Sequence, residues 1–576
     1  MAGKTLEPNS WPGDPAGGKK RQGRIKACLT VVLVLGLLAF QGRRWLFPVW
    51  ESKATPLLVA SAAQCPAQPV LRPNHRPDIT ERNIEQIFRS ARFRDHVGQR
   101  LSGAVKVPSI SYDGMGKVGE DRRWDIFYEL GDYLRSTFPL IYEHFEVSTV
   151  NEHGLLYTWS GSDASLKPLL FMAHQDVVPV SNSTLSRWTY PPFSGHYDGE
   201  FVWGRGSEDD KSTLIAVLSA MTALLEADFI PARTVILAVG FDEEGGYPES
   251  YGAKALSNLL EKKYGADSME MIFDEGVAGI ETHFGTEFAG PATAEKGYVD
   301  ITVTVETSGG HSSTPPDHTA IGYLAEIISL IERNPFPSTL TSGNPTGNYL
   351  SCLAEYGETI PSDLKDAILD RKDTRRVIDY MEKSLDTRAL IRTSSAIDVV
   401  HGGSKANNLP DSAYILVNHR IAVDQSVQAV KDYYIDILTP LSEKLNFTLC
   451  GFSENKSCIS SDSTVRSKIL LESSDELEPS PSSDPSDPRF GWLTGTLRGV
   501  FGEEVIVSPV LLTGNTDTKY YWNLSSQIYR MAPWRAERDP RGTNMHTVDE
   551  RMPVAGLLEM ITFFHEFIRV VDESRR

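Results

Sequence analysis

Several short apolar runs in this chain are each followed at once by acidic or imidazole side chains. One run ends in His174, with Asp176 two residues later, TVILAVG at 234–240 leads into FDEEGG at 241–246, and a third run leads into Asp274. Uninterrupted apolar runs of this length are typical of strands that are buried on both faces. They constrain the fold strongly, because such a sheet needs helices packed on both of its sides.

The residues between these runs predict helices, so the expected fold class is α/β with a mostly parallel sheet. At 212–227, apolar side chains recur on one helical face. The carboxyl ends of parallel strands meet at one edge of the sheet, where α/β folds bind ligands. GRGSEDDK adds the carboxylate of Asp209 to this edge, and we expect Asp210 and Lys211 to be solvated. Each residue taken alone also fits a plainer explanation, a core histidine or a solvated acidic turn.

A change of pattern midway along the chain indicates a second domain inserted into the first. Residues 298–305 alternate strictly between apolar and polar side chains, as in a strand with one wet face. We assign 297–460 to an inserted α+β domain, and 80–296 with 461–576 to the catalytic domain. The Ser-, Asp- and Pro-rich stretch at 460–487 is interpreted as a surface connection.

The N-terminus predicts a membrane anchor, with the bulk of the protein on the lumenal side. A basic cytosolic tail at 1–26 precedes an apolar segment at 27–42, and a stalk follows at 43–79. The apolar segment is short for a spanning helix, which needs about 20 residues, so a cleavable signal peptide is the competing interpretation. We favour the signal anchor of a single-pass type II membrane protein, because no small-residue cleavage site follows the segment closely.

Sequons and cysteines support the lumenal orientation. Four acceptor sequons for N-glycosylation occur, at Asn182, Asn446, Asn455 and Asn523. Cys450 and Cys458 close a short loop that could carry a disulfide in an oxidising compartment. Cys65 could pair with Cys352, although a buried free thiol is an equal alternative for Cys352.

Composition and missing motifs exclude several classes of function. The net charge of −19 argues against a nucleic-acid partner. The chain has no HExxH motif, which excludes a thermolysin-like zinc site. It also has no GxSxG elbow and no papain-type cysteine signature, so covalent catalysis has no candidate. Imidazoles and carboxylates gathered at one sheet edge would instead suit zinc.

Five motifs stand in order along the chain: HQD at 174–176, GRGSEDDK at 204–211, DEEGG at 242–246, DEG at 274–276 and the late His546. Together they resemble the aminoacylase/carboxypeptidase family of dinuclear zinc hydrolases. The resemblance covers roughly residues 80–571 and includes the inserted domain, which in this family is a lid or dimerisation domain. The chain is most similar to the fungal vacuolar carboxypeptidases, signal-anchored lumenal glycoproteins, so a vacuolar location is expected.

The resemblance implies two zinc ions per subunit and assigns roles to this chain's residues. It divides five ligands between the ions: His174 and Asp274 on one zinc, Glu244 and His546 on the other, and Asp209 bridging both. It makes Glu243 the general base and gives Asp176 the task of orienting His174.

Three substrate contacts are also implied by the resemblance. SGGHSS at 308–313 matches the lid histidine, which makes His311 the residue that stabilises the oxyanion. Asn408 matches an asparagine that contacts substrate. LTGNTD at 512–517 resembles a loop that binds the substrate carboxylate through the backbone around Gly514, with Asn515 in place of the usual second glycine.

The expected function is a zinc-dependent carboxypeptidase that releases C-terminal residues from short peptides of the Gly-X type. An N-acyl-amino-acid amidohydrolase is the alternative, because both reactions cleave an amide beside a free carboxylate. An inactive membrane-tethered binding protein is a third candidate, which the complete ligand set disfavours. Arg420 and Arg535 could pair with a carboxylate, but we interpret both as ordinary surface or interdomain arginines. A homodimer formed through the inserted domain is a further possibility that the sequence leaves open.

Overall fold

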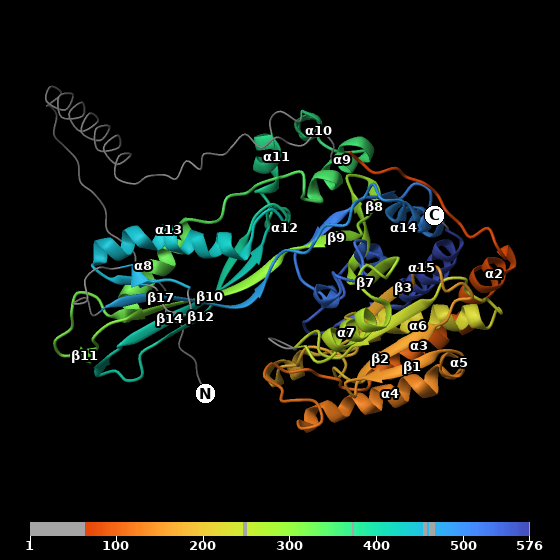
Figure 1. Cartoon of the computed structure of the whole chain (residues 1–576), viewed down its shortest axis with the longest axis horizontal. Helices are drawn as coiled ribbons and strands as arrows, with labels where there is room; N and C mark the ends of the chain where they lie inside the picture. The colour runs from red at the N-terminus through yellow and green to blue at the C-terminus, as the bar shows by residue number, and fades with distance from the viewer. Residues whose placement is uncertain (1–63, 246–249, 371–373, 453–457, 460–466, 575–576) are drawn as a thin grey trace, which may run out of the picture. The chain divides into compact units, whose positions relative to one another are not determined.

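The computed structural model describes residues 64–574 apart from 246–249, 371–373, 453–457 and 460–466 (Figure 1). The expected cytosolic tail, the expected anchor and most of the expected stalk lie outside the described residues. Among the helices within the described ranges, none is both long enough and apolar enough to cross a membrane.

A ten-stranded sheet forms the centre of the catalytic domain. Four neighbouring strands run parallel at its middle, in the order β6 (Val235–Gly240), β3 (Leu169–His174), β7 (Met271–His283) and β20 (Ile528–Arg535). The predicted strands that end at His174 and at 240 are therefore confirmed as parallel neighbours. Their carboxyl ends lie at the same edge, which is where the acidic motifs follow.

The outer strands make the sheet mixed rather than mostly parallel. On one side β2 (Gly154–Trp159) pairs antiparallel with β6, and β1 (Glu146–Val150) pairs antiparallel with β2. On the other side β20 is followed by β9 (Ala292–Glu295) and β19 (Val510–Leu512). Two short strands pair off this path: β8 (Thr286–Ala289) and β18 (Ile506–Val507). The prediction of a mostly parallel sheet is correct for the centre alone.

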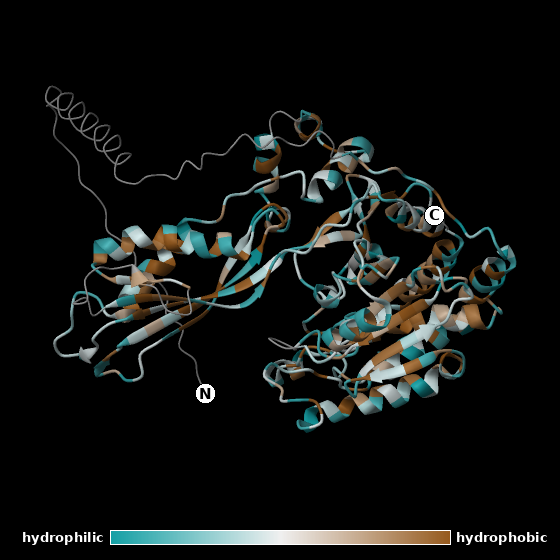
Figure 2. Cartoon of the chain, viewed as in Figure 1, coloured by the Kyte–Doolittle hydropathy of each residue, from teal (hydrophilic) through white to brown (hydrophobic). Residues whose placement is uncertain are grey.

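Helices bury both faces of this sheet. Along β3, Leu169 and Phe171 pack into the larger core, while Leu170 and Met172 pack into a second core on the opposite face. The elements that supply the larger core include α3 (Ala91–Val105), α4 (Ile126–Thr137), α6 (Lys211–Leu225), α14 (Pro488–Phe501) and α15 (Val554–Glu573). The opposite face is covered by α7 (Ala253–Tyr264). Figure 2 shows the hydrophobic colour concentrated on the central strands, whereas α4 alternates between teal and brown.

The inserted domain is built on a separate antiparallel layer. Its sheet has six strands: β12 (Ser394–Gly402), β14 (Ser412–Ile421), β10 (Gly297–Glu306), β17 (Lys468–Leu477), β15 (Thr448–Cys450) and β16 (Cys458–Ile459). The alternation predicted from 298–305 is confirmed, because every second residue of β10 is buried. The buried face packs against α8 (Ala320–Arg333) and α13 (Val427–Leu445).

The domain boundary at 460 and the surface connection at 460–487 are wrong in part. Residues 468–477 form β17, which lies between β10 and β15 in the inserted sheet. Ile469 and Leu471 of this strand are buried in the core of the inserted domain. The acidic and serine-rich half of the strand concealed this short apolar alternation, so the inserted domain extends to about 477.

A group of helices inside 297–460 belongs with the catalytic sheet instead. These are α9 (Thr346–Tyr356), α10 (Ser362–Leu369), α11 (Thr374–Met381) and α12 (Leu385–Ala389). Leu350 and Cys352 of α9 share a hydrophobic cluster with Phe288 of β8 and Ile506 of β18. The inserted sequence therefore contributes to both layers, which the single boundary did not anticipate.

The last part of the expected stalk is packed against the catalytic domain. Gln68 pairs with the backbone of Val507 through both ends of its amide, at 2.8 and 3.0 Å. Leu71 lies over Gly495 of α14, and its backbone N–H donates to the Gly495 carbonyl at 2.9 Å. Both anticipated disulfides are present, Cys65–Cys352 and Cys450–Cys458. The first of them fixes this N-terminal segment to α9.

Candidate metal centre

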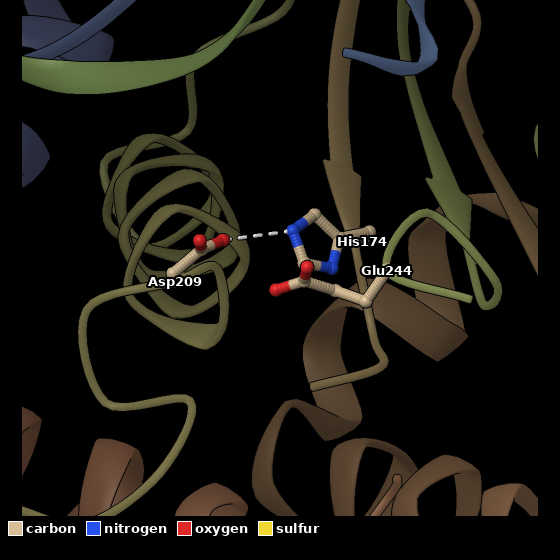
Figure 3. A group of neighbouring side chains, drawn as sticks. All are labelled: His174, Asp209 and Glu244. Atoms are coloured by element: carbon tan, nitrogen blue, oxygen red, sulfur yellow. Dashed lines mark hydrogen bonds and ion pairs between the residues drawn. The ribbon is translucent and has the colours of Figure 1, made fainter. Parts of the chain in front are cut away.

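His174, at the end of β3, lies near the carboxylates of Asp209 and Glu244 (Figure 3). Its Nε2 atom is 2.9 Å from Asp209 Oδ1 and 3.4 Å from Glu275 Oε1. Its Nδ1 atom faces Asp176, 3.0 Å from the carbonyl oxygen and 3.3 Å from Oδ1. The ring is thus held from one side while its other nitrogen is directed into the cluster. Burial opposes protonation, but the charge of Glu275 and the bonds to Asp176 and Asp209 raise the pKa of His174 well above its usual range.

Asp176 connects His174 to the Glu243-Glu244 pair. Its Oδ1 accepts a hydrogen bond from the backbone N–H of Glu243 at 3.1 Å, and its Oδ2 accepts one from that of Glu244 at 2.9 Å. The hydroxyl of Ser111 also donates to Oδ2, at 2.5 Å. The same buried carboxylate therefore orients the imidazole and the turn after β6, which is the arrangement expected of a residue that supports metal ligands.

Asp209 lies in the loop between β5 (Phe201–Trp203) and α6, and its two carboxylate oxygens face two different imidazoles. Oδ1 is 2.9 Å from His174 Nε2, whereas Oδ2 is 3.0 Å from His546 Nε2. His546 comes from the segment before β21 (Arg551–Pro553) and also lies 2.9 Å from Glu244 Oε1. Hydrogen bonds to Asp209 and Glu244 raise the pKa of His546 to about 10.

The expectation that Asp210 and Lys211 are solvated is wrong, since both are buried. Asp210 Oδ2 accepts a hydrogen bond from the backbone N–H of His174 at 3.2 Å. The Lys211 ammonium donates to the carbonyl oxygens of Ala104 and Val107 at 3.0 and 2.7 Å. Burial lowers the pKa of Lys211 to about 7. These residues fasten the loop that carries Asp209 to its surroundings.

The structure brings Glu275, rather than Asp274, into the cluster. Glu275, His174 and Glu243 each offer a ligand atom within 4.8 Å of the others, as do His174, Asp209 and Glu244. Asp274 belongs to neither group, and its Oδ1 accepts the backbone N–H of Glu275. Successive side chains of a strand point to opposite faces, which accounts for the separate placement of the two acids. The Oδ2 atom of Asp274 is nevertheless buried and has no hydrogen-bond partner among the described residues. Glu275 is therefore a further candidate ligand on the His174 side, and the assignment of Asp274 stays a prediction from the sequence.

The donor set fits metal cations. Two imidazoles meet the carboxylates of Asp209, Glu243, Glu244 and Glu275, which gives more negative charge than the imidazoles can balance. Burial raises the pKa of Glu243 and Glu275 well above the usual range, because the neighbouring imidazoles do not offset the cost of removing both carboxylates from water. Nitrogen and oxygen donors at this density suit zinc.

A pocket of about 470 Å³ opens beside this cluster. Its walls include the metal cluster, the loop at 512–516, and Tyr298 with Arg420 of the inserted domain. The expected substrate contact Gly514 lines this pocket. Met545 and Ala532 add apolar surface, so the pocket combines a charged floor with an apolar side.

His311 and Asn408 are not brought to the pocket of their own chain. They lie opposite each other in a two-stranded ribbon, β11 (Gly310–His311) and β13 (Asn408–Leu409), and both are exposed. His311 Nδ1 accepts a hydrogen bond from the Ser313 backbone N–H at 3.1 Å. Neither residue lines the cavity that contains Gly514.

Arg420 is the pocket residue that the sequence interpretation undervalued. It lies one residue before the end of β14, directly opposite Tyr298 of β10, and its guanidinium lies over the Tyr298 ring, 4.7 Å from the centroid. The signal available was its position at the end of a strand with one wet face. Arg535, in contrast, pairs with Glu287 and Glu559, as an ordinary interdomain or surface arginine would.

Comparisons with known proteins agree with this geometry. The model of Peptidase family M20/M25/M40 matches residues 170–570. Carboxypeptidase S of Saccharomyces cerevisiae is 42% identical over 507 residues, which cover 85% of this chain and 87% of that protein. The N-fatty-acyl-amino acid synthase/hydrolase PM20D1 of Bos taurus is 30% identical over 482 residues, covering 82% and 87%. An M20 family metallo-carboxypeptidase from Sulfolobus solfataricus shares the fold, with a TM-score of 0.55 at 18% identity over 82% of this chain and 98% of that one.

The family match and the cluster of imidazoles and carboxylates together define a metal-dependent hydrolase. The chain belongs to peptidase family M20/M25/M40, and it is a metallocarboxypeptidase. The family and the class of enzyme inferred from the motifs are thereby confirmed.

Proposed function

We propose that this enzyme binds two zinc ions and releases the C-terminal residue of short peptides, with glycine preferred at the penultimate position. One observation supports the metal pair above all. The two oxygens of the Asp209 carboxylate face the imidazoles of His174 and His546 separately, as a carboxylate shared between two ions would. Glu275 would complete the His174 side, and Glu244 would complete the His546 side.

The proposed chemistry is attack of a water molecule on the scissile amide. Bound zinc ions would polarise the carbonyl and bring the pKa of a water molecule toward neutrality. Glu243 lines the pocket beside His174, and it would accept the proton from the water and deliver it to the leaving nitrogen. Asp176 would keep Glu243 in place through the backbone hydrogen bond.

The proposed substrate carries a free carboxylate next to the scissile bond. Arg420 lines the pocket and has no carboxylate partner among the described residues, so its charge remains available for that group. Gly514 lies on the same wall, and its missing side chain leaves open space above the backbone. A cationic side chain beside an open backbone supports recognition of a C-terminal carboxylate.

His311 and Asn408 remain proposed contributors to oxyanion and substrate binding. Because the two residues lie side by side on one ribbon, a movement that brings His311 to a substrate would bring Asn408 with it. We propose that they reach a site either by closure of the inserted domain or from the second subunit of a homodimer. Replacing His311 with alanine and mixing this variant with an inactive Glu243→Gln variant distinguishes the routes, since only a shared site regains activity in the mixed dimer.

A lumenal, vacuolar location is part of the proposal. Both disulfides support an oxidising compartment. Three sequon asparagines lie exposed on the described surface, at Asn182, Asn446 and Asn523. The signal anchor at 27–42 stays a prediction from the sequence.

Hydrolysis of N-acyl amino acids is the second candidate, because a relative of that named activity is 30% identical to this chain. Both reactions would use the same metal centre and the same site for the substrate carboxylate. The part of the pocket that binds the other side of the scissile amide would therefore decide between them. The test compares kcat/KM for benzyloxycarbonyl-Gly-Leu with that for N-fatty-acyl amino acids. Faster turnover of the peptide supports the carboxypeptidase, and faster turnover of the acyl substrates supports the alternative. A protein that bound zinc but hydrolysed neither would be the inactive tethered binding protein.

A further inference from the structure

Asn515 connects the pocket loop to the inserted domain through both ends of its side-chain amide. Its Oδ1 accepts a hydrogen bond from the Arg420 guanidinium at 2.9 Å. Its Nδ2 donates to the carbonyl oxygen of Lys296 at 2.6 Å. Lys296 lies between β9 of the catalytic sheet and β10 of the inserted domain, so one amide joins the loop, the domain junction and the arginine.

The loop that carries Asn515 has a firm base. Thr516 and Thr518 both donate to the Glu295 carboxylate at 2.9 Å. Glu295 also forms an ion pair with Arg530 at 2.9 Å, and both of these side chains are fully buried. Because this buried network is satisfied on several sides, the backbone at 515 is held against the end of β9.

Arg420 is held on its other side by the inserted sheet. The Tyr298 ring lies beneath the guanidinium, and the Tyr298 hydroxyl donates to Asp300 at 3.2 Å. Long arginine side chains lose much rotamer freedom when they bind a ligand. Contacts that already fix the guanidinium in the free enzyme reduce this cost.

We propose that Asn515 is a positioning residue that presents Arg420 to the substrate carboxylate and thereby sets the affinity for substrates with a free C-terminus. This inference rests on the proposed function and deepens it. An amide suits the task because it accepts from Arg420 without cancelling the positive charge, and it donates to Lys296 at the same time. An aspartate would neutralise the arginine, whereas glycine or alanine would leave the arginine unsupported.

The experiment measures kcat and KM for benzyloxycarbonyl-Gly-Leu with the zinc-loaded wild type, Asn515→Ala and Asn515→Asp. For Asn515→Ala we expect KM to rise about tenfold and kcat to stay within about threefold, as for loss of a charge-assisted hydrogen bond used in binding. For Asn515→Asp, which has nearly the same shape, we expect a larger rise in KM. The preference for the free acid over its C-terminal carboxamide should fall in both variants.

A double-mutant cycle separates positioning from general support of the fold. In the Arg420→Ala background, Asn515→Ala should have no further effect on KM, because Asn515 acts through Arg420. A full tenfold effect in that background would overturn the inference, as would an unchanged KM in both single variants. A wild type that shows no preference for the free acid over the carboxamide would instead overturn the proposed function. The two failures are therefore distinguishable.

Discussion

Arg205 and Glu550 form a buried ion pair between the loop that carries Asp209 and the segment that carries His546. The second oxygen of Glu550 accepts backbone N–H groups of the same loop, from Gly206 at 2.8 Å and from Glu208 at 3.2 Å. The two sides of the candidate metal centre are therefore joined by one carboxylate that does not itself face the cluster.

Replacing Glu550 with glutamine should weaken metal binding without removing a ligand. Loss of a supporting residue of this kind typically lowers metal affinity about 10–100-fold. The measurement is zinc affinity by competition with a chelator, with activity recovered at high zinc. Glu503→Gln is the matched control, because Glu503 pairs with Arg72 on the exposed surface and should leave zinc affinity unchanged. Equal affinity in Glu550→Gln and wild type would contradict the role of this ion pair.

Replacing Glu243 with glutamine should abolish nearly all turnover while both metal ions remain bound. The amide retains the shape of the side chain but cannot accept a proton from water. Metal content by elemental analysis, alongside kcat, tests this. Loss of a metal ion from the variant would make Glu243 a ligand instead of the general base.

Glu275 and Asp274 are adjacent acids for which we expect opposite results. Glu275→Ala should lower the zinc content from two ions per chain to one, because Glu275 faces His174. Asp274→Asn should retain both ions, because Asp274 shares no candidate ligand group with His174. The reverse pattern in the metal analysis would restore Asp274 as the ligand.

His419 should make the inserted domain less stable in acid. Burial lowers its pKa to about 4, compared with about 6.5 in an unfolded chain. Between these values the unfolded state binds more protons, so stability falls as the pH decreases from about 6.5 to about 4, by up to about 3 kcal/mol. His419→Gln should flatten the dependence of the thermal unfolding midpoint on pH in this range. The exposed His144→Gln serves as the control, and an unchanged pH dependence in His419→Gln would refute the assignment.

Local sequence patterns predicted the strands that build the site. The features that the patterns did not predict depend on tertiary packing. The run ending at His174 and the alternation at 298–305 became β3 and β10, because burial of strand faces leaves a direct periodic signal. Helix α9 carries no local sign that it packs on the catalytic sheet. The choice between Asp274 and Glu275 depends on which face of β7 is turned to His174, and a single residue of register reverses it.

Arg420 was interpreted as an ordinary surface or interdomain arginine for a related reason. Its neighbours in sequence show only a strand with one wet face. The contact that holds it at the pocket is a hydrogen bond to Asn515, which is 95 residues away along the chain. The supporting pair of Arg205 and Glu550 is separated by 345 residues and was equally invisible before the fold was known.

The central proposal is that carboxypeptidase activity depends on metal ions that the cluster around Asp209 would hold. The most direct measurement follows hydrolysis of benzyloxycarbonyl-Gly-Leu by protein dialysed against a chelator, with metal content determined on the same sample. We predict that activity disappears with the metal and returns as zinc is restored to two ions per chain. Full activity in a preparation verified to be free of metal would contradict the account.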